Sequence, residues 1–206
     1  MNTMKLYLSS YRIPDFQKFV DFVGKPAEEI RLGLILNAKD DKTREERAIK
    51  RDELIAYFQG LGFKTEEIDL RDYYLSGDIY LKFLEFDVVW LNGGNTYSLR
   101  SALALSKAEA PLKKALKSGV IYGGDSAGAI VAGPTLKYFD NVDDTTVVKN
   151  PVYDGLGFVD YAVLPHWNSE EYGESLKETE RNLTNNGYNT VRVTNEEYLF
   201  FAKELK

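Results

Sequence analysis

The chain has 206 residues, of which 44% are hydrophobic and 28% are charged, and its formal net charge is −6. These values suit one folded domain spanning residues 1–206 and give no sign of disorder. The sequence holds no cysteine and one histidine, which excludes disulfides, thiolate catalysis, cysteine-ligated metal centres and a multi-histidine metal site.

In chain order, the apolar runs and helical spacings predict alternating elements. The predicted elements are strand 5–9, helix 15–23, strand 31–36, helix 43–61, strands 64–70 and 86–91, helices 96–105 and 111–117, strand 120–123, helix 127–131, strand 160–164, helix 169–185 and strands 190–193 and 198–202.

The helix 43–61 is the clearest of these elements. Thr43 and Glu46 have the spacing of a capping box at its start. Apolar residues then recur at helical spacing, namely Ile49, Leu54, Ile55, Phe58 and Leu61.

Alternation of strands and helices predicts an α/β fold with a mostly parallel sheet covered by helices on both faces. In such sheets ligands bind beyond the carboxyl ends of the strands. The loops after the predicted strands are therefore the places to look for chemistry.

The acidic balance argues against a nucleic-acid partner, because a surface that binds phosphates needs a basic excess. The opening MNTMKLYLSSYRIPDF has too short an apolar run for a signal peptide, and no run of about 18 apolar residues could span a membrane. We therefore expect a cytoplasmic protein with no membrane partner.

The segment 119–133 is the most informative, because a β-branched run leads into Gly124-Asp125-Ser126-Ala127-Gly128 and a small-residue helix leads out. This fits G-x-S-x-G, the strand-to-helix elbow that exposes a nucleophilic serine. Glycines are needed two residues before and after Ser126, because these positions approach each other closely. The amide of Ala127 then lies at a helix N-terminus, where it can stabilise an oxyanion. The alternative is an ordinary βα turn with a surface serine.

A second glycine loop, Asn92-Gly93-Gly94-Asn95-Thr96, follows the predicted strand 86–91. Asn95 or Thr96 could cap the next helix, and Gly93 or Gly94 could supply the second oxyanion donor. A phosphate loop is less favoured, because neither phosphate-binding glycine motif is present. A plain tight turn is the remaining alternative.

His166 follows the predicted strand 160–164, where a strand-end base would lie. A serine nucleophile needs a base that titrates near neutral pH, so His166 is the only histidine able to serve, with a lysine base as the alternative. A carboxylate should orient the imidazole. Asp140, Asp143, Asp144 and Asp154 all lie between the serine and the histidine, and spacing does not choose among these four candidates. Asp125 adjoins Ser126, but neighbouring side chains at an elbow diverge.

These motifs together resemble peptidase E, the α-aspartyl dipeptidase family. The resemblance rests on 93–96, 124–129, Pro134-Thr135 and Pro165-His166, in that order, and extends over most of the chain. It implies a flavodoxin-like three-layer sandwich related to the class I glutamine amidotransferases. It also implies a Ser–Asp–His triad that releases N-terminal aspartate from dipeptides, without a metal or cofactor.

Carried onto this sequence, the resemblance places the nucleophile at Ser126, the base at His166 and the triad aspartate at Asp144, with Asp143 and Asp140 as alternatives. It implies oxyanion donors at Ala127 and the Gly93-Gly94 pair. Arg181 would read the aspartyl carboxylate and Asn95 would contact the substrate.

Asp125 and Trp167-Asn168 depart from the family pattern, and a carboxylate at residue 125 would repel an acidic substrate unless it is paired.

From the resemblance as a whole, we expect a small peptide as substrate and a monomer or homodimer. The alternatives are a cyanophycinase-like enzyme, another amide or ester hydrolase, or a non-catalytic small-molecule-binding protein on the same fold.

Overall fold

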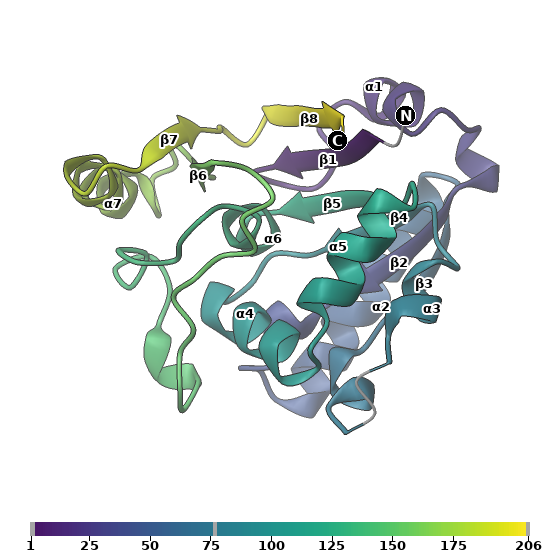
Figure 1. Ribbon diagram of the computed structural model, residues 1–206, viewed down its shortest axis with the longest axis horizontal. Coiled ribbons are helices and arrows are strands. Elements are labelled where there is room, and N and C mark those ends of the chain that lie inside the picture. The colour runs from purple at the N-terminus through teal and green to yellow at the C-terminus, as the bar shows by residue number, and fades with distance from the viewer. Residues whose placement is uncertain (1–2, 76–77, 205–206) are drawn as a thin grey trace.

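The structure, a computed structural model, describes residues 3–75 and 78–204; residues 1–2, 76–77 and 205–206 of the predicted domain lie outside the described part. Its centre is a six-stranded sheet with the order β3-β2-β4-β5-β1-β8 (Figure 1). Neighbouring strands run parallel, except that β8 pairs antiparallel with β1 at the sheet edge. Strands β6 and β7 form a second, parallel pair.

The strands are β1 Thr3–Ser9, β2 Arg31–Ile35, β3 Lys64–Glu67, β4 Val88–Leu91, β5 Ile121–Asp125, β6 Tyr161–Leu164, β7 Asn189–Arg192 and β8 Tyr198–Glu204. The helices are α1 Phe16–Val23, α2 Arg44–Gly60, α3 Tyr80–Phe83, α4 Thr96–Leu105, α5 Glu109–Lys117, α6 Ala127–Val131 and α7 Gly173–Asn185. Short 3₁₀ turns are η1 Ala27–Glu29, η2 Asn37–Lys39, η3 Leu70–Tyr73 and η4 Thr145–Val147.

Apolar side chains fill both faces of the main sheet. On one face, Phe19 of α1 and Phe58 of α2 pack with Trp90 of β4. On the other face, α3 to α6 bury a larger cluster that includes Tyr97 of α4 and Tyr122 of β5. The predicted three-layer α/β arrangement is thus confirmed, and the uninterrupted burial of β4 and β5 is typical of strands covered on both faces.

Each predicted strand and helix has a counterpart in the structure, with ends that differ by a few residues. The capping box at Thr43 and Glu46 is present in α2. Ile49 departs from the predicted apolar stripe, because its side chain is 58% exposed. The short helix α3 was not predicted, and the antiparallel edge strand β8 is the one exception to parallel pairing in the main sheet.

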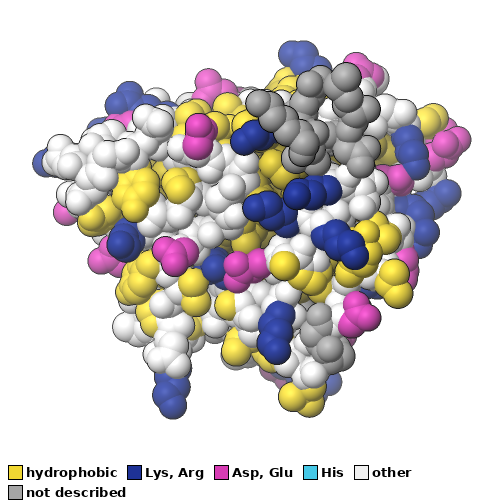
Figure 2. Space-filling model, in the orientation of Figure 1, with side chains coloured by type: hydrophobic (Ala, Val, Ile, Leu, Met, Phe, Trp, Pro, Cys, Tyr) yellow, Lys and Arg dark blue, Asp and Glu magenta, His cyan; other side chains and the backbone are white. Residues whose placement is uncertain are grey.

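Strands β6 and β7, with α7 packed on them, extend the molecule beyond the carboxyl ends of β1 and β5 (Figure 1). Figure 2 shows charged side chains of both signs on the face it presents, with Lys and Arg gathered near its centre over α5. None of the described helices is both long and apolar enough to cross a membrane.

Candidate functional site

The candidate site forms where the carboxyl ends of several strands meet. Ser10 follows β1, Lys39 ends the turn after β2, Ser126 follows β5 and His166 follows β6. The four residues 92–95, which we call the glycine turn, follow β4. This convergence is the placement that the strand-end rule predicts.

The residues 124–128, which we call the serine turn, have the tight geometry that their glycines require. A Cβ atom at Gly124 would lie 2.7 Å from the carbonyl carbon of Gly128, and one at Gly128 would overlap the carbonyl oxygen of Leu91. Ser126 adopts φ 51° and ψ −112°, a conformation that L-residues rarely occupy. The close approach expected from the G-x-S-x-G spacing is therefore present, and the turn separates Ser126 from the side chain of Asp125.

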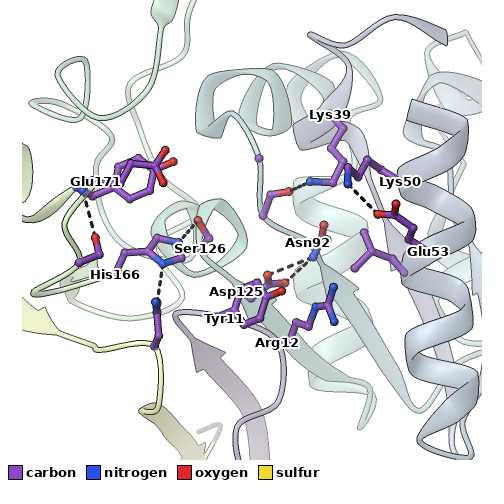
Figure 3. A pocket seen from close by; sticks show the side chains of 16 residues that line it. Tyr11, Arg12, Lys39, Lys50, Glu53, Asn92, Asp125, Ser126, His166 and Glu171 are labelled. Carbon is purple, nitrogen blue, oxygen red and sulfur yellow. Dashed lines mark hydrogen bonds and ion pairs between the residues drawn. The ribbon is translucent and has the colours of Figure 1, made fainter. Parts of the chain in front are cut away.

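The Ser126 hydroxyl is hydrogen-bonded to the imidazole of His166, with 2.9 Å between Oγ and Nε2 (Figure 3). His166 also has a positive φ, 57°, a backbone conformation that L-residues rarely adopt. The ring of Tyr172 lies against it, with centroids 5.3 Å apart. A serine and a histidine in hydrogen-bond contact are the pair that activates a hydroxyl for nucleophilic attack.

The other ring nitrogen of His166 contacts an amide and not a carboxylate. Nδ1 lies 2.7 Å from Oδ1 of Asn195, which follows β7 and is exposed to solvent. The buried Ser10 hydroxyl donates to the same Oδ1 at 2.9 Å and accepts the backbone N–H of His166 at 2.5 Å. Asn195 and Ser10 therefore hold the ring from the side opposite Ser126.

The structure does not support the prediction of Asp144 as the orienting acid. Its exposed carboxylate accepts hydrogen bonds from the backbone and hydroxyl of Thr146 and begins η4. These bonds lower the pKa of Asp144. The carboxylate is thus used to cap a local turn, and Asn195 occupies the position at Nδ1.

The alternative acids are also used elsewhere. Asp143 accepts from the backbone and hydroxyl of Thr96 at the start of α4, and burial raises its pKa. It lies on the wall of a cavity that also reaches Ser126. Asp140 and Asp154 are exposed, and the carbonyl oxygen of Asp154 accepts a hydrogen bond from Arg100.

The glycine turn lies directly against the serine turn. A Cβ atom at Gly93 would come 2.8 Å from Cβ of Ser126, and one at Gly94 would overlap the carbonyl oxygen of Ala38. Asp125 is buried, and its carboxylate accepts from Trp90 Nε1 at 2.7 Å and from Asn92 Nδ2 at 2.9 Å. Burial raises the pKa of Asp125, and these donors oppose that rise.

Two backbone amides beside Ser126 have the character of oxyanion donors. The N–H groups of Ala127, at the N-terminus of α6, and of Gly94, in the glycine turn, have no acceptor among the described residues. Gly93 differs in its burial, because it is buried, whereas Gly94 is exposed and lines both cavities beside Ser126. Of the predicted glycine pair, the geometry therefore favours Gly94.

The remaining predicted residues, Asn95 and Arg181, lie in different settings. Asn95 caps α4 through Ser98 N at 2.9 Å, as predicted, and its Nδ2 donates to the carbonyl of Asp144 at 2.9 Å. It also lines a cavity beside Ser126. Arg181 is exposed on α7 and is not among the residues that line the two cavities at Ser126.

Two cavities flank the serine and share Gly94, Ser126, His166 and Tyr172. The larger has a volume of about 430 Å³, a size typical of small-molecule sites. Its charged lining residues are Arg12, Lys39, Lys50, Glu53, Asp125 and Glu171 (Figure 3). The smaller has a volume of about 250 Å³, and its charged lining residues other than His166 are Asp41, Lys42 and Asp143.

Sequence reasoning missed Ser10, Lys39 and Asn195. Each lies in a loop after a strand, so the strand-end rule could have found them. Asn195 is not an acid and lies beyond His166 in the sequence, so the prediction of an acid between Ser126 and His166 excludes it by type and by position. Within the described residues, no group of three His, Asp or Glu side chains is placed to hold a metal ion.

Comparison with known proteins agrees with the fold and the family expectation. An uncharacterised peptidase of Pasteurella multocida is 27% identical over 84% of this chain and 82% of its own length. The peptidase E of Streptomyces coelicolor is 34% identical over 53% of this chain. An uncharacterised peptidase of Listeria monocytogenes is 33% identical over 56% of this chain. The last two matches span 44% and 57% of the relatives' own lengths.

Two crystal structures share the fold. A protein of Listeria monocytogenes EGD-e provisionally named peptidase E superposes with a TM-score of 0.78, at 24% identity, over 99% of this chain and 100% of its own. A peptidase from an acI-B1 actinobacterium gives 0.73 at 16% identity, over 97% of this chain and 84% of its own. The family model of peptidase family S51 matches residues 19–204, so the chain belongs to peptidase family S51.

Proposed function

We propose that this S51 peptidase is a serine exopeptidase that hydrolyses small peptides, preferentially dipeptides with an N-terminal aspartate. The observation that carries the proposal is the 2.9 Å contact between Ser126 Oγ and His166 Nε2. It lies at a turn where two backbone amides, of Gly94 and Ala127, are available to a substrate oxygen.

In the proposed reaction, His166 Nε2 takes the hydroxyl proton while Ser126 Oγ attacks the scissile carbonyl carbon. The amides of Gly94 and Ala127 hold the resulting oxyanion, and each such donor is worth about 3 kcal/mol of barrier reduction. His166 then gives its proton to the leaving amine. Water hydrolyses the acyl-serine ester by the same route and restores Ser126.

The proposed orienting residue is Asn195. For Nε2 to accept the proton of Ser126, the neutral imidazole must carry its own proton on Nδ1, which points at Asn195 Oδ1. The amide therefore fixes the tautomer as a triad carboxylate would, but it supplies no negative charge to the imidazolium formed during the reaction.

The preference for an acidic residue is supported by the cations of the larger cavity. Lys50 is paired with Glu53 at 2.8 Å, and Lys39 donates to the carbonyl of Gly93. The Arg12 guanidinium lies over the Tyr57 ring at 4.4 Å, which supports it without neutralising it. We therefore propose Arg12, in place of Arg181, as the residue that binds the aspartyl carboxylate.

The first test measures hydrolysis of Asp-Leu, Asn-Leu and Ala-Leu by the wild-type chain and Ser126→Ala, with fluorophosphonate labelling of Ser126 in parallel. We expect Asp-Leu to be cleaved fastest and the substitution to lower turnover by about 10⁴-fold or more with an unchanged fold. Serine-dependent cleavage of esters or of β-aspartyl–arginine links alone would establish a different hydrolase. Absence of both hydrolysis and labelling would favour a binding protein.

The second test concerns specificity and compares Arg12→Gln with Arg181→Gln as a matched control. Loss of a charge-assisted contact should lower kcat/KM for Asp-Leu about 10- to 100-fold in Arg12→Gln. Asn-Leu should change less than about threefold, because it lacks the carboxylate. Equal losses on both substrates, or a loss in Arg181→Gln alone, would contradict the assignment of Arg12.

A further inference from the structure

One peptide unit of the glycine turn is held at its carbonyl end by a lysine. Nζ of Lys39 donates to the carbonyl oxygen of Gly93 at 2.7 Å. In a trans peptide the C=O of one residue and the N–H of the next point in opposite directions. The bond to Gly93 O therefore also fixes the direction of the Gly94 N–H.

Held in this way, the Gly94 N–H points toward the side of the glycine turn on which Ser126 lies. Lys39 approaches from the turn after β2, and in Figure 3 it lies on the side of the glycine turn away from Ser126. Gly93 is buried against Ser126, whereas Gly94 is exposed and lines both cavities. The N–H of Gly94 thus faces the cavity beside Ser126, where a substrate carbonyl attacked by the serine would lie.

The surroundings of Lys39 strengthen its hydrogen bond to the carbonyl oxygen of Gly93. Burial lowers the pKa of Lys39, while Asp125 of β5 and Asp41 of the following loop oppose that fall. Lys42 and, from α2, Lys50 act in the same sense as burial. A cation at a carbonyl oxygen polarises the peptide, which makes its N–H a better hydrogen-bond donor in a site of low dielectric.

We propose that Lys39 is a positioning residue for the oxyanion hole: its ammonium holds and polarises the Gly93–Gly94 peptide, so that the Gly94 N–H stabilises the oxyanion. The inference rests on the proposed function, because it needs Ser126 to be acylated. It gives a half-buried lysine a role in the chemical step, distinct from a role in reading the substrate carboxylate.

The test compares Lys39→Met and Lys39→Arg with Lys113→Met, which removes an exposed lysine of α5 that lines neither cavity beside Ser126. Turnover of Asp-Leu is measured together with inhibition by free aspartate and by the boronic acid analogue of aspartate. The tetrahedral boronate places an oxygen in the oxyanion hole, whereas free aspartate reports ground-state binding.

We expect Lys39→Met to lower kcat about 10- to 100-fold, less than the loss of a whole oxyanion donor. The boronate inhibition constant should rise by the same factor, while KM and the aspartate inhibition constant change less than about threefold. Lys39→Arg should recover most of the loss, because it retains a cationic donor. Lys113→Met should match the wild type.

Wild-type kcat and boronate affinity in Lys39→Met would overturn the inference. A rise in KM confined to acidic substrates would also overturn it, because Lys39 would then bind the substrate carboxylate.

If Lys39→Met does not fold, the amide proton of Gly94 is followed by NMR in the wild-type boronate complex. Its signal should shift when Lys39 loses its proton at alkaline pH, and a constant signal would overturn the inference. A wild-type chain that neither labels at Ser126 nor binds the boronate would instead remove the proposed function, and the inference with it.

Discussion

The serine turn and the glycine turn both join a buried strand to a helix, yet different forces fix their shapes. Backbone packing fixes the serine turn, because Gly124, Gly128 and Leu91 leave no room for an added Cβ atom. Polar side chains fix the glycine turn, because Lys39 donates to the carbonyl oxygen of Gly93 and the Asp125 carboxylate accepts from the side chain of Asn92. A turn of the first kind is encoded in a short spacing, whereas one of the second kind depends on residues far away in the sequence.

The sharpest way to break the serine turn is Gly128→Ala. The new methyl group would overlap the carbonyl oxygen of Leu91 in β4, so strand and helix must separate. We expect a loss of about 3 kcal/mol or more in the free energy of unfolding, measured in urea. Gly60→Ala is the matched control, because its Cβ would meet nothing within 4 Å. Equal stability of the two variants would show that packing does not fix the turn.

The support behind His166 can be tested by giving Asn195 a charge or by removing its acceptor. Asn195→Leu should lower the rate of Ser126 labelling about 10- to 100-fold through loss of the tautomer-fixing bond. Asn195→Asp adds an anion at 2.7 Å from Nδ1, which favours the protonated imidazole. The acid limb of the labelling rate should therefore move to higher pH.

The other titratable groups around the imidazole are Asp143 and Tyr172, with Glu171 on the cavity wall. They are unchanged in both Asn195 variants, so a shift between wild type and Asn195→Asp reports the new carboxylate. An unshifted acid limb together with normal labelling in Asn195→Leu would contradict the positioning role.

Asp69 supports the glycine turn indirectly, and we expect this support to weaken at low pH. Asp69 accepts from Asn37 of η2, the turn that carries Lys39, and from Arg71, and it also pairs with Arg47. Burial raises the pKa of Asp69, but these donors outweigh it and lower the pKa from 3.8 to about 2. Because the folded pKa is the lower one, the stabilisation is present above pH 4 and is lost as the pH falls toward 2.

This stabilisation amounts to about 2 kcal/mol. Asp69→Asn should therefore unfold more easily than wild type at pH 6, and the difference should shrink as the pH approaches 2. Unfolding free energies of both proteins, measured between pH 6 and pH 2, test whether the difference in stability shrinks as the pH falls. A difference that is constant with pH would show that Asp69 acts through packing alone.

The smallest effect is expected at Asp144. Asp144→Asn keeps a side-chain acceptor for Thr146 at the start of η4, so stability should change by less than about 1 kcal/mol. Peptidase activity should stay within about twofold of wild type, since Asn195 and not Asp144 contacts His166. A tenfold loss of kcat would instead indicate that Asp144 takes part in catalysis.

The strands, the helices and the serine turn could be predicted because each is encoded locally, in periodicity or in a five-residue spacing. The partner of His166 could not, because β6 and β7 bring Asn195 to it across 29 residues, and spacing does not distinguish the several acids that precede His166. The role suggested for Lys39 was likewise hidden, since its contact with Gly93 spans 54 residues. Whether Arg181 reaches the cavity could not be predicted for a different reason, because helical periodicity does not tell which face of α7 meets the cavity.

The place of β1 in the sheet has a consequence for synthesis on the ribosome. The first strand of the chain pairs with β5, which begins at Ile121, and with β8, which begins at Tyr198. Contacts of such long sequence separation form late in folding. β6 and β7, which present the imidazole and its amide partner, are also made after the serine turn. A nascent chain that already contains Ser126 therefore lacks the hydrogen bond between Ser126 and His166 until the later strands emerge.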